Sequence, residues 1–115
     1  MQDGVVRLTY AIQFVAETDR DVAFYRDVLG LTLKYQSPQW SEFATGTTSL
    51  ALHPASATNP AGKVQLGFSV PDLADFYARS SAAGVVFTQP PTLEGRSLLA
   101  RFLDAQGNEI SVSEG

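Results

Sequence analysis

A short helical pattern that occurs twice constrains the fold of this chain more than any other feature. Residues 19–31 read DRDVAFYRDVLGL, with apolar residues at helical spacing and a glycine close behind them. Residues 72–84 contain the same Phe-Tyr pair and also end in a glycine, which is typical of a helix C-terminus. Thr18 or Asp19 is expected to cap the first helix and Asp72 the second. We therefore predict two helices and an internal repeat with a period of roughly 50 residues.

The segments around the two helices predict the same order of elements in each half of the chain. The expected strands are residues 7–15, 31–35, 39–44 and 48–53 in the first half, and residues 64–70, 85–87, 96–103 and 108–113 in the second. Pro90 and Pro91 are expected to break the chain into a loop. The predicted fold class is α+β, with two β-α-β-β-β modules at about residues 5–54 and 63–114 of one domain, residues 1–115. Two such modules facing each other, within the chain or across a dimer, would enclose a curved cavity.

Composition and charge exclude several classes of function. The chain has 115 residues, of which 44% are hydrophobic and 17% charged, as expected for one globular domain. Its formal net charge of -4 and its lack of a Lys/Arg cluster argue against a nucleic-acid partner. The absence of cysteine excludes disulfides, thiolate metal sites and cysteine nucleophiles. No segment is apolar enough to cross a membrane and residues 1–4 show no secretory signal, so we expect a cytoplasmic protein without a membrane partner.

Several motifs together resemble the vicinal oxygen chelate superfamily, which includes glyoxalases, bleomycin-resistance proteins and extradiol dioxygenases. The matching segments span nearly the whole chain and are residues 14–15, 21–31, 69–73 and 102–110. Ala105 departs from the family pattern, which usually has proline at that position. The resemblance implies that the paired modules form a curved sheet around a ligand cavity, commonly in a homodimer.

The resemblance also implies four inward-facing positions that hold a divalent metal in the family's enzymes, mostly through His and Glu. Carried onto this chain by their offset from the motifs, these positions are Tyr10, Ala51, Gln65 and Ser111. None is a histidine or a carboxylate, so we predict that the protein has no metal and no other cofactor. A displaced metal site of His53, Gln65 and Glu109 is an alternative, because residues two apart in a strand share a face.

Without a metal, the aromatic and polar residues of the expected cavity favour a hydrophobic or aromatic small-molecule ligand. The predicted ligand-binding residues are Tyr10, Phe14, Trp40, Phe43, His53, Gln65, Glu109 and Ser111. The primary interpretation is a metal-free homodimer, similar to the bleomycin-resistance branch, that binds or sequesters such a ligand. Two alternatives stay open: a metal-dependent lyase, isomerase or dioxygenase with a displaced metal site, and a pseudoenzyme whose cavity is filled by its own side chains. The aromatic residues also have a simpler interpretation as core residues, and His53 and Glu109 as surface residues at strand ends.

Overall fold

The computed structural model describes residues 6–115, which divide into two compact units. The N-terminal unit comprises Thr9–Val64. The C-terminal unit comprises Gln65–Gly115 together with the described residues up to Leu8. Residues 1–4, on which we based the prediction of no secretory signal, lie outside the described part of the chain.

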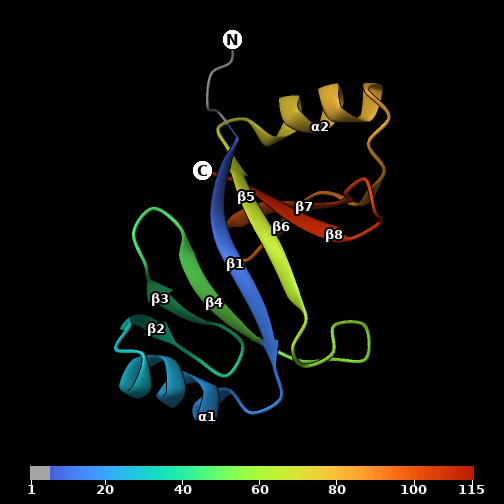
Figure 1. Ribbon diagram of the computed structural model, residues 1–115. Helices are drawn as coiled ribbons and strands as arrows, with labels where there is room; N and C mark the ends of the chain where they lie inside the picture. Colours follow the sequence, from blue (N-terminus) through green and yellow to red (C-terminus); the bar gives the residue numbers. More distant parts are fainter. Residues whose placement is uncertain (1–5) are drawn as a thin grey trace. The chain divides into compact units, whose positions relative to one another are not determined.

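The N-terminal unit consists of one helical segment and four strands, in the predicted β-α-β-β-β order (Figure 1). Its elements are β1 (Arg7–Val15), α1 (Thr18–Ala23), the π-helical turn η1 (Phe24–Val28), β2 (Thr32–Gln36), β3 (Ser41–Ala44) and β4 (Ser49–Pro54). The strands are ordered β2-β3-β4-β1, and β1 pairs with β4 in parallel while the other pairs are antiparallel. The first strand of the unit, β1, is therefore hydrogen-bonded to its last strand, β4.

The helical segment of this unit differs from the single amphipathic helix that the sequence predicts. The α-helix ends at Ala23, and the wider π-helical turn η1 follows it directly. In this turn the Leu29 N–H donates to the Phe24 carbonyl, five residues earlier in the chain. Gly30 follows with a φ of 76°, in the left-handed region, as is typical of a glycine that ends a helix. The predicted cap is wrong, because Glu17 precedes the helix and its side chain makes no capping hydrogen bond.

The C-terminal unit repeats this architecture with different packing residues. Its elements are β5 (Val64–Val70), α2 (Leu73–Ala82), β6 (Phe87–Glu94), β7 (Ser97–Leu103) and β8 (Glu109–Glu114). The strands are ordered β5-β8-β7-β6, with β5 and β8 parallel and the rest antiparallel. Asp72 caps α2 as predicted, since its carboxylate accepts from the Asp75 N–H at 3.0 Å. Gly84, which closes the segment, has a φ of 98°. The α+β class with two β-α-β-β-β modules is confirmed.

Strand β6 contradicts the prediction that the chain breaks at Pro90 and Pro91. The strand runs through both prolines and pairs with β7 alone, at the edge of the unit's strand order. Proline lacks an N–H, and an edge strand can accept it because one side of the strand needs no hydrogen-bonding partner. The pairing register shifts between Gln89 and Thr92, which places the prolines in an irregular part of the ladder.

Each unit buries an apolar cluster between its helix and its strands. In the N-terminal unit this cluster contains Val15, Val22, Phe43 and Leu52. In the C-terminal unit it contains Val70, Leu73, Ala100 and Val112. The opposite face of each set of strands carries no helix of its own unit; we call it the helix-free face.

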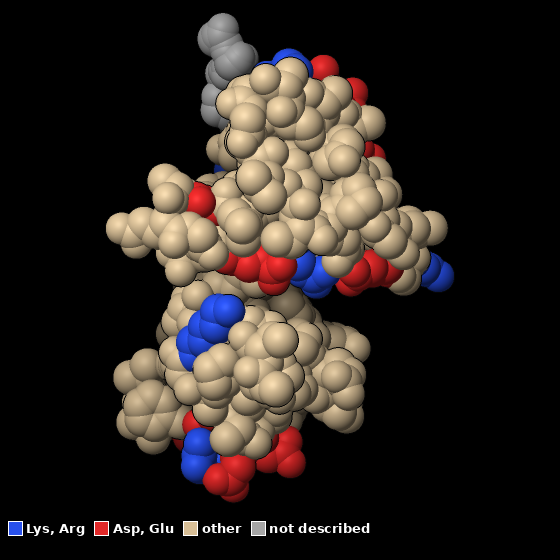
Figure 2. All heavy atoms as spheres, turned by 90° about the vertical axis from the view of Figure 1, so that its right-hand side faces the viewer, with Lys and Arg blue, Asp and Glu red and all other residues tan. Residues whose placement is uncertain are grey.

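No helix within residues 6–115 has the length and apolar character needed to span a membrane. On the face drawn in Figure 2, the described Lys and Arg side chains lie among Asp and Glu side chains rather than in one basic patch.

Candidate functional site

The helix-free face of the N-terminal unit gathers aromatic and charged side chains. Strand alternation and register place Ile12 of β1 and Glu42 of β3 beside Ala51 of β4. Tyr10 and Trp40 pack against the buried cluster of Ile12, Phe14 and Ala51 on this face. The face therefore has an apolar floor with polar groups at its margin.

An aromatic and carboxylate cluster lies beside the apolar floor of this face. The rings of Tyr10 and Trp40 meet edge to face, with centroids 5.4 Å apart and planes at 82°. The indole Nε1 of Trp40 donates to Glu42 Oε1 at 3.0 Å, and Lys34 Nζ lies 3.1 Å from Glu42 Oε2. Only 15% of the Glu42 side chain is exposed, so the carboxylate is held by two donors in a partly dry setting. We call Tyr10, Trp40, Glu42 and Lys34 the Trp40 cluster.

The sequence predicts Tyr10 and Trp40 as ligand-binding residues but does not identify Glu42, which accepts from Trp40, or Lys34, which pairs with Glu42. The two-residue period of a strand is the signal that would have found Glu42, because it places residue 42 on the same side as residue 40. Lys34 comes from the neighbouring strand β2 and could be found only from the pairing of β2 with β3.

Phe14 and His53 form a second contact on the same face. Their rings lie 5.3 Å apart at 60°, and Nδ1 of His53 lies 2.8 Å from the carbonyl oxygen of Pro54. A carbonyl only accepts hydrogen bonds, so in this contact Nδ1 of His53 is the donor. His53 is half-buried.

Phe43 lies on the other face of the same strands. It is fully buried in the cluster beneath α1, with its ring 5.8 Å from that of Tyr25. The structure therefore separates Phe43 from Tyr10 and Trp40 and makes it a core residue.

The helix-free face of the C-terminal unit holds the remaining predicted residues. Gln65 Nε2 donates to Glu109 Oε1 at 3.3 Å, and Thr88 Oγ1 donates to Glu109 Oε2 at 2.7 Å. Gln65 and Ser111 are 6% and 8% exposed, which makes them buried polar residues. Arg101 lies opposite Ser111 in the ladder and donates to Gln89. This face offers hydrogen-bonding groups, whereas the face of the N-terminal unit offers aromatic rings.

The chemistry of the four positions inferred from the family does not fit a divalent metal. A phenol, a methyl group, an amide and a hydroxyl stand at Tyr10, Ala51, Gln65 and Ser111, and such groups are poor ligands for the metals that His and Glu bind. Within residues 6–115, no three His, Cys, Asp or Glu side chains form a group that could hold a metal ion.

Tyr10 is expected to ionise at a higher pH than an ordinary tyrosine. Burial raises its pKa above the usual 10.0, the Glu42 carboxylate raises it further, and Lys34 opposes them. The folded chain holds the phenol proton of Tyr10 more tightly than the unfolded chain does. Well below pH 10.0 the phenol is protonated in both states, so its ionisation does not change the free energy of unfolding. That free energy falls as the pH rises from 10.0 through the raised pKa. We expect Glu42→Gln to lower the pKa of Tyr10 and Lys34→Met to raise it.

This titration is measured by tyrosinate absorbance in the unsubstituted protein, in Glu42→Gln and in Lys34→Met. From each curve one subtracts the curve of the same protein that also carries Tyr10→Phe, which leaves the signal of Tyr10. A difference curve with an ordinary midpoint, unmoved by both substitutions, would contradict the description of the cluster.

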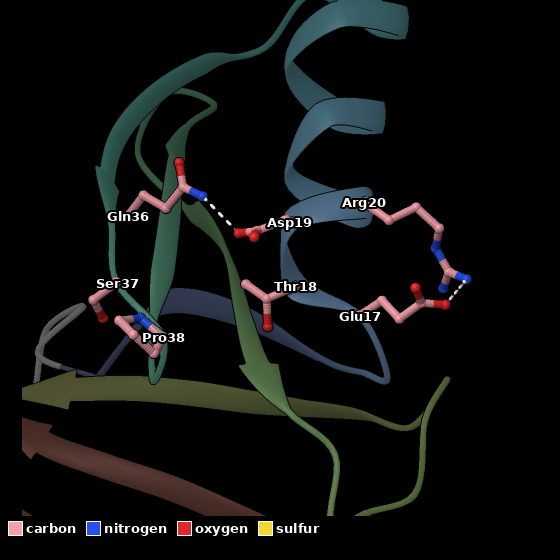
Figure 3. Close-up of a pocket in the computed structure, with 7 residues that line it drawn as sticks. All are labelled: Glu17, Thr18, Asp19, Arg20, Gln36, Ser37 and Pro38. Carbon is pink, nitrogen blue, oxygen red and sulfur yellow. Dashed lines mark hydrogen bonds and ion pairs between the residues drawn. The ribbon is translucent and has the colours of Figure 1, made fainter.

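A separate hollow of about 560 Å³ lies at the start of α1 (Figure 3). It is lined by Glu17, Thr18, Asp19, Arg20, Gln36, Ser37 and Pro38. Arg20 pairs with Glu17 at 2.7 Å, and Gln36 Nε2 donates to Asp19 at 3.2 Å. The charged groups of the lining are therefore paired with other lining residues by ion pairs or hydrogen bonds. The described lining includes no aromatic residue. The Trp40 cluster is therefore the better candidate site for an aromatic ligand.

Sequence comparison places the chain in a known family over most of its length. A sequence model described as the Glyoxalase/Bleomycin resistance protein/Dioxygenase superfamily matches residues 7–112. No curated protein sequence matches the chain significantly.

The solved structures with a similar fold include enzymes with different activities. A methylmalonyl-CoA epimerase from Mycobacterium tuberculosis is 22% identical, with a TM-score of 0.80 over 99% of this chain and 91% of that one. An NAD-dependent benzaldehyde dehydrogenase from Legionella pneumophila is 17% identical, with a TM-score of 0.77 over 91% and 96%. A 2,3-dioxygenase from Pseudomonas sp. KL28 is 16% identical, with a TM-score of 0.71 over 94% of this chain and 42% of that one. At these identities the similarity shows the fold alone.

Proposed function

The chain belongs to the Glyoxalase/Bleomycin resistance protein/Dioxygenase superfamily, and from this premise we propose that it binds a hydrophobic or aromatic small molecule without a metal. Its role would be to sequester that molecule, as a member of the metal-free, bleomycin-resistance-like branch. The observation that carries this proposal is the Trp40 cluster, in which two aromatic rings stand beside a hydrogen-bonded carboxylate.

The chemistry of this cluster suits a planar ligand. Edge-to-face or offset contacts between aromatic rings contribute about 0.5–1.5 kcal/mol each beyond the area they bury. Tyr10 and Trp40 are both partly exposed, so each has ring surface available for such contacts. A ligand with a hydrogen-bond donor or a positive charge would gain further from the Glu42 carboxylate, which already accepts from Trp40.

Trp40 provides a direct test, because it is the one tryptophan of the chain. We expect 1-naphthol and 1-naphthylmethylammonium to change its fluorescence in a saturable way, with the cation bound more tightly. Tyr10→Ala should weaken binding at least tenfold, because it removes one wall of the cluster. Phe24→Ala is the matched control, since Phe24 is an exposed aromatic residue of η1 that belongs to the same unit.

Metal dependence separates this proposal from the enzymatic alternative. We expect the protein treated with a chelator to bind both probes with unchanged affinity. Stoichiometric Zn, Ni, Mn or Fe that is lost in His53→Ala, with probe binding lost alongside it, would overturn the proposal in favour of a displaced metal site. If neither probe raises the melting temperature or changes Trp40 emission, the interpretation as a pseudoenzyme with a filled cavity replaces it.

We also propose that the protein is a cytoplasmic homodimer with no nucleic-acid or membrane partner. The family commonly forms homodimers, and the described charges on the face in Figure 2 are mixed in sign. Light scattering during size-exclusion chromatography gives the oligomeric state directly. A monomer at micromolar concentration, or retention on a polyanionic resin at physiological salt, would contradict this part of the proposal.

A further inference from the structure

An apolar groove lies in the C-terminal unit between α2 and the strands, on the face opposite Gln65 and Ser111. Its volume is about 480 Å³, within the range of small-molecule sites. The strands contribute Leu66 and Phe68 of β5 and Phe102 of β7 to its lining. The groove is distinct from the helix-free faces, because these residues point toward α2.

The groove exists because α2 lacks a large side chain where its apolar stripe should continue. Leu73, Phe76 and Tyr77 are spaced as one face of a helix, and the next position on that face is Ser80. Phe76 fills the first part of the interface, with its ring 6.0 Å from that of Phe102. The small side chain of Ser80 leaves the next part open, and Leu66 remains 39% exposed there.

One carboxylate lies in this lining. Asp104 accepts from the backbone N–H groups of Gln106 at 2.9 Å and Asn108 at 2.8 Å, and from the Asn108 side chain at 3.1 Å. These hydrogen bonds hold the pKa of Asp104 below its ordinary value, so the group is ionised at neutral pH. No Lys or Arg is among the described residues that line the groove, so its charge is negative.

We propose that this groove binds an alkylammonium or arylalkylammonium ion, with the hydrocarbon part between α2 and the strands and the ammonium group beside Asp104. An apolar lining attracts the hydrocarbon, and charge complementarity selects the head group. A fatty carboxylate of the same length would bring a like charge to Asp104 and should bind poorly. This site is independent of the Trp40 cluster and does not rest on the function proposed for it.

Three probes with the same hydrocarbon chain test the head-group selection: octylammonium, octanol and octanoate, titrated calorimetrically into the 115-residue chain below their micelle concentrations. We expect octylammonium to bind more tightly than octanol, and at least tenfold more tightly than octanoate. Octylammonium should also bind roughly tenfold more tightly than hexylammonium, because each buried methylene adds to the affinity. Equal affinity for the three head groups, or no binding of octylammonium, would overturn the proposal.

Substitutions locate the site. Ser80→Leu should abolish binding because its side chain fills the groove, whereas Ser81→Leu, which adds the same side chain at the exposed neighbouring position, should leave affinity unchanged. Asp104→Asn should bring octylammonium to within about twofold of octanol. Unchanged binding of octylammonium to Ser80→Leu would overturn the proposal. It would also be overturned if the unsubstituted protein were a dimer that binds none of the probes and Ser80→Leu were a monomer, because the groove would then be a contact between two copies of the chain. Tyr10→Ala should have no effect, which distinguishes this site from the Trp40 cluster.

Discussion

Replacing Phe43 by alanine is expected to lower the free energy of unfolding by about 3–5 kcal/mol. Phe43 is fully buried and packs with Val22, Leu52 and Tyr25 beneath α1. Its removal leaves a cavity that the short strand β3 cannot close by shifting, because β3 is paired on both sides. Urea denaturation followed by far-ultraviolet circular dichroism measures the change.

Phe24→Ala is the control for this prediction. Phe24 is 47% exposed on η1, so the same truncation should cost less than about 1 kcal/mol. If Phe43→Ala instead kept its stability and lost probe binding, Phe43 would be a ligand contact as the sequence suggested, and the register that pairs Phe43 with Leu50 would be wrong.

Replacing Glu42 by alanine is expected to lower the free energy of unfolding by about 1–3 kcal/mol, because the half-buried indole N–H of Trp40 would lose its acceptor. The emission of Trp40 should change at the same time, since the group that holds its ring in place is gone. Chemical denaturation with fluorescence detection reports both effects in one experiment.

Glu42→Gln separates the hydrogen bond from the charge. Glutamine keeps an oxygen that can accept from Trp40 but loses the ion pair with Lys34, whose side chain is 49% exposed. An ion pair with one exposed partner contributes little, so this variant should lose less than about 1 kcal/mol. Equal stability of the alanine and glutamine variants would show that the Trp40 hydrogen bond does not stabilise the cluster.

The order of elements could be predicted from the sequence because each element has a local signal. The apolar stripe and closing Gly84 mark α2, and Asp72 marks its start. The turn from α1 into η1 could not be predicted in this way. Helix periodicity is nearly the same for the two forms over five residues. Tyr25, within this turn, and Leu31, after it, pack against the core cluster of the unit, and the local sequence does not contain that contact.

The composition of the site could be predicted only in part, because strand faces depend on an exact period of two. Trp40 and Phe43 are three residues apart, so an extended chain turns them to opposite faces, and the prediction that joined them was inconsistent with this period. Glu42, between them, shares the face of Trp40. Lys34 reaches Glu42 from another strand, and no local pattern contains that contact.

Strand β6 shows why proline cannot be interpreted from its local sequence alone. Pro90 and Pro91 would end a strand inside a sheet, but β6 pairs on one side only. Whether a strand is at an edge follows from the order of all the strands in the unit, which residues 85–95 by themselves do not contain.

The parallel pairing of β1 with β4, and of β5 with β8, has a consequence for how the protein folds as it is synthesised. In each unit the first strand leaves the ribosome well before the strand that pairs with it in parallel. The core of each unit can therefore form only after the residues between the two strands have been synthesised. Contacts between residues so far apart in sequence slow folding, because closing the intervening loop costs chain entropy. A nascent chain that ends before Ser49 lacks the parallel partner of β1, so that side of β1 stays unpaired until β4 has been made.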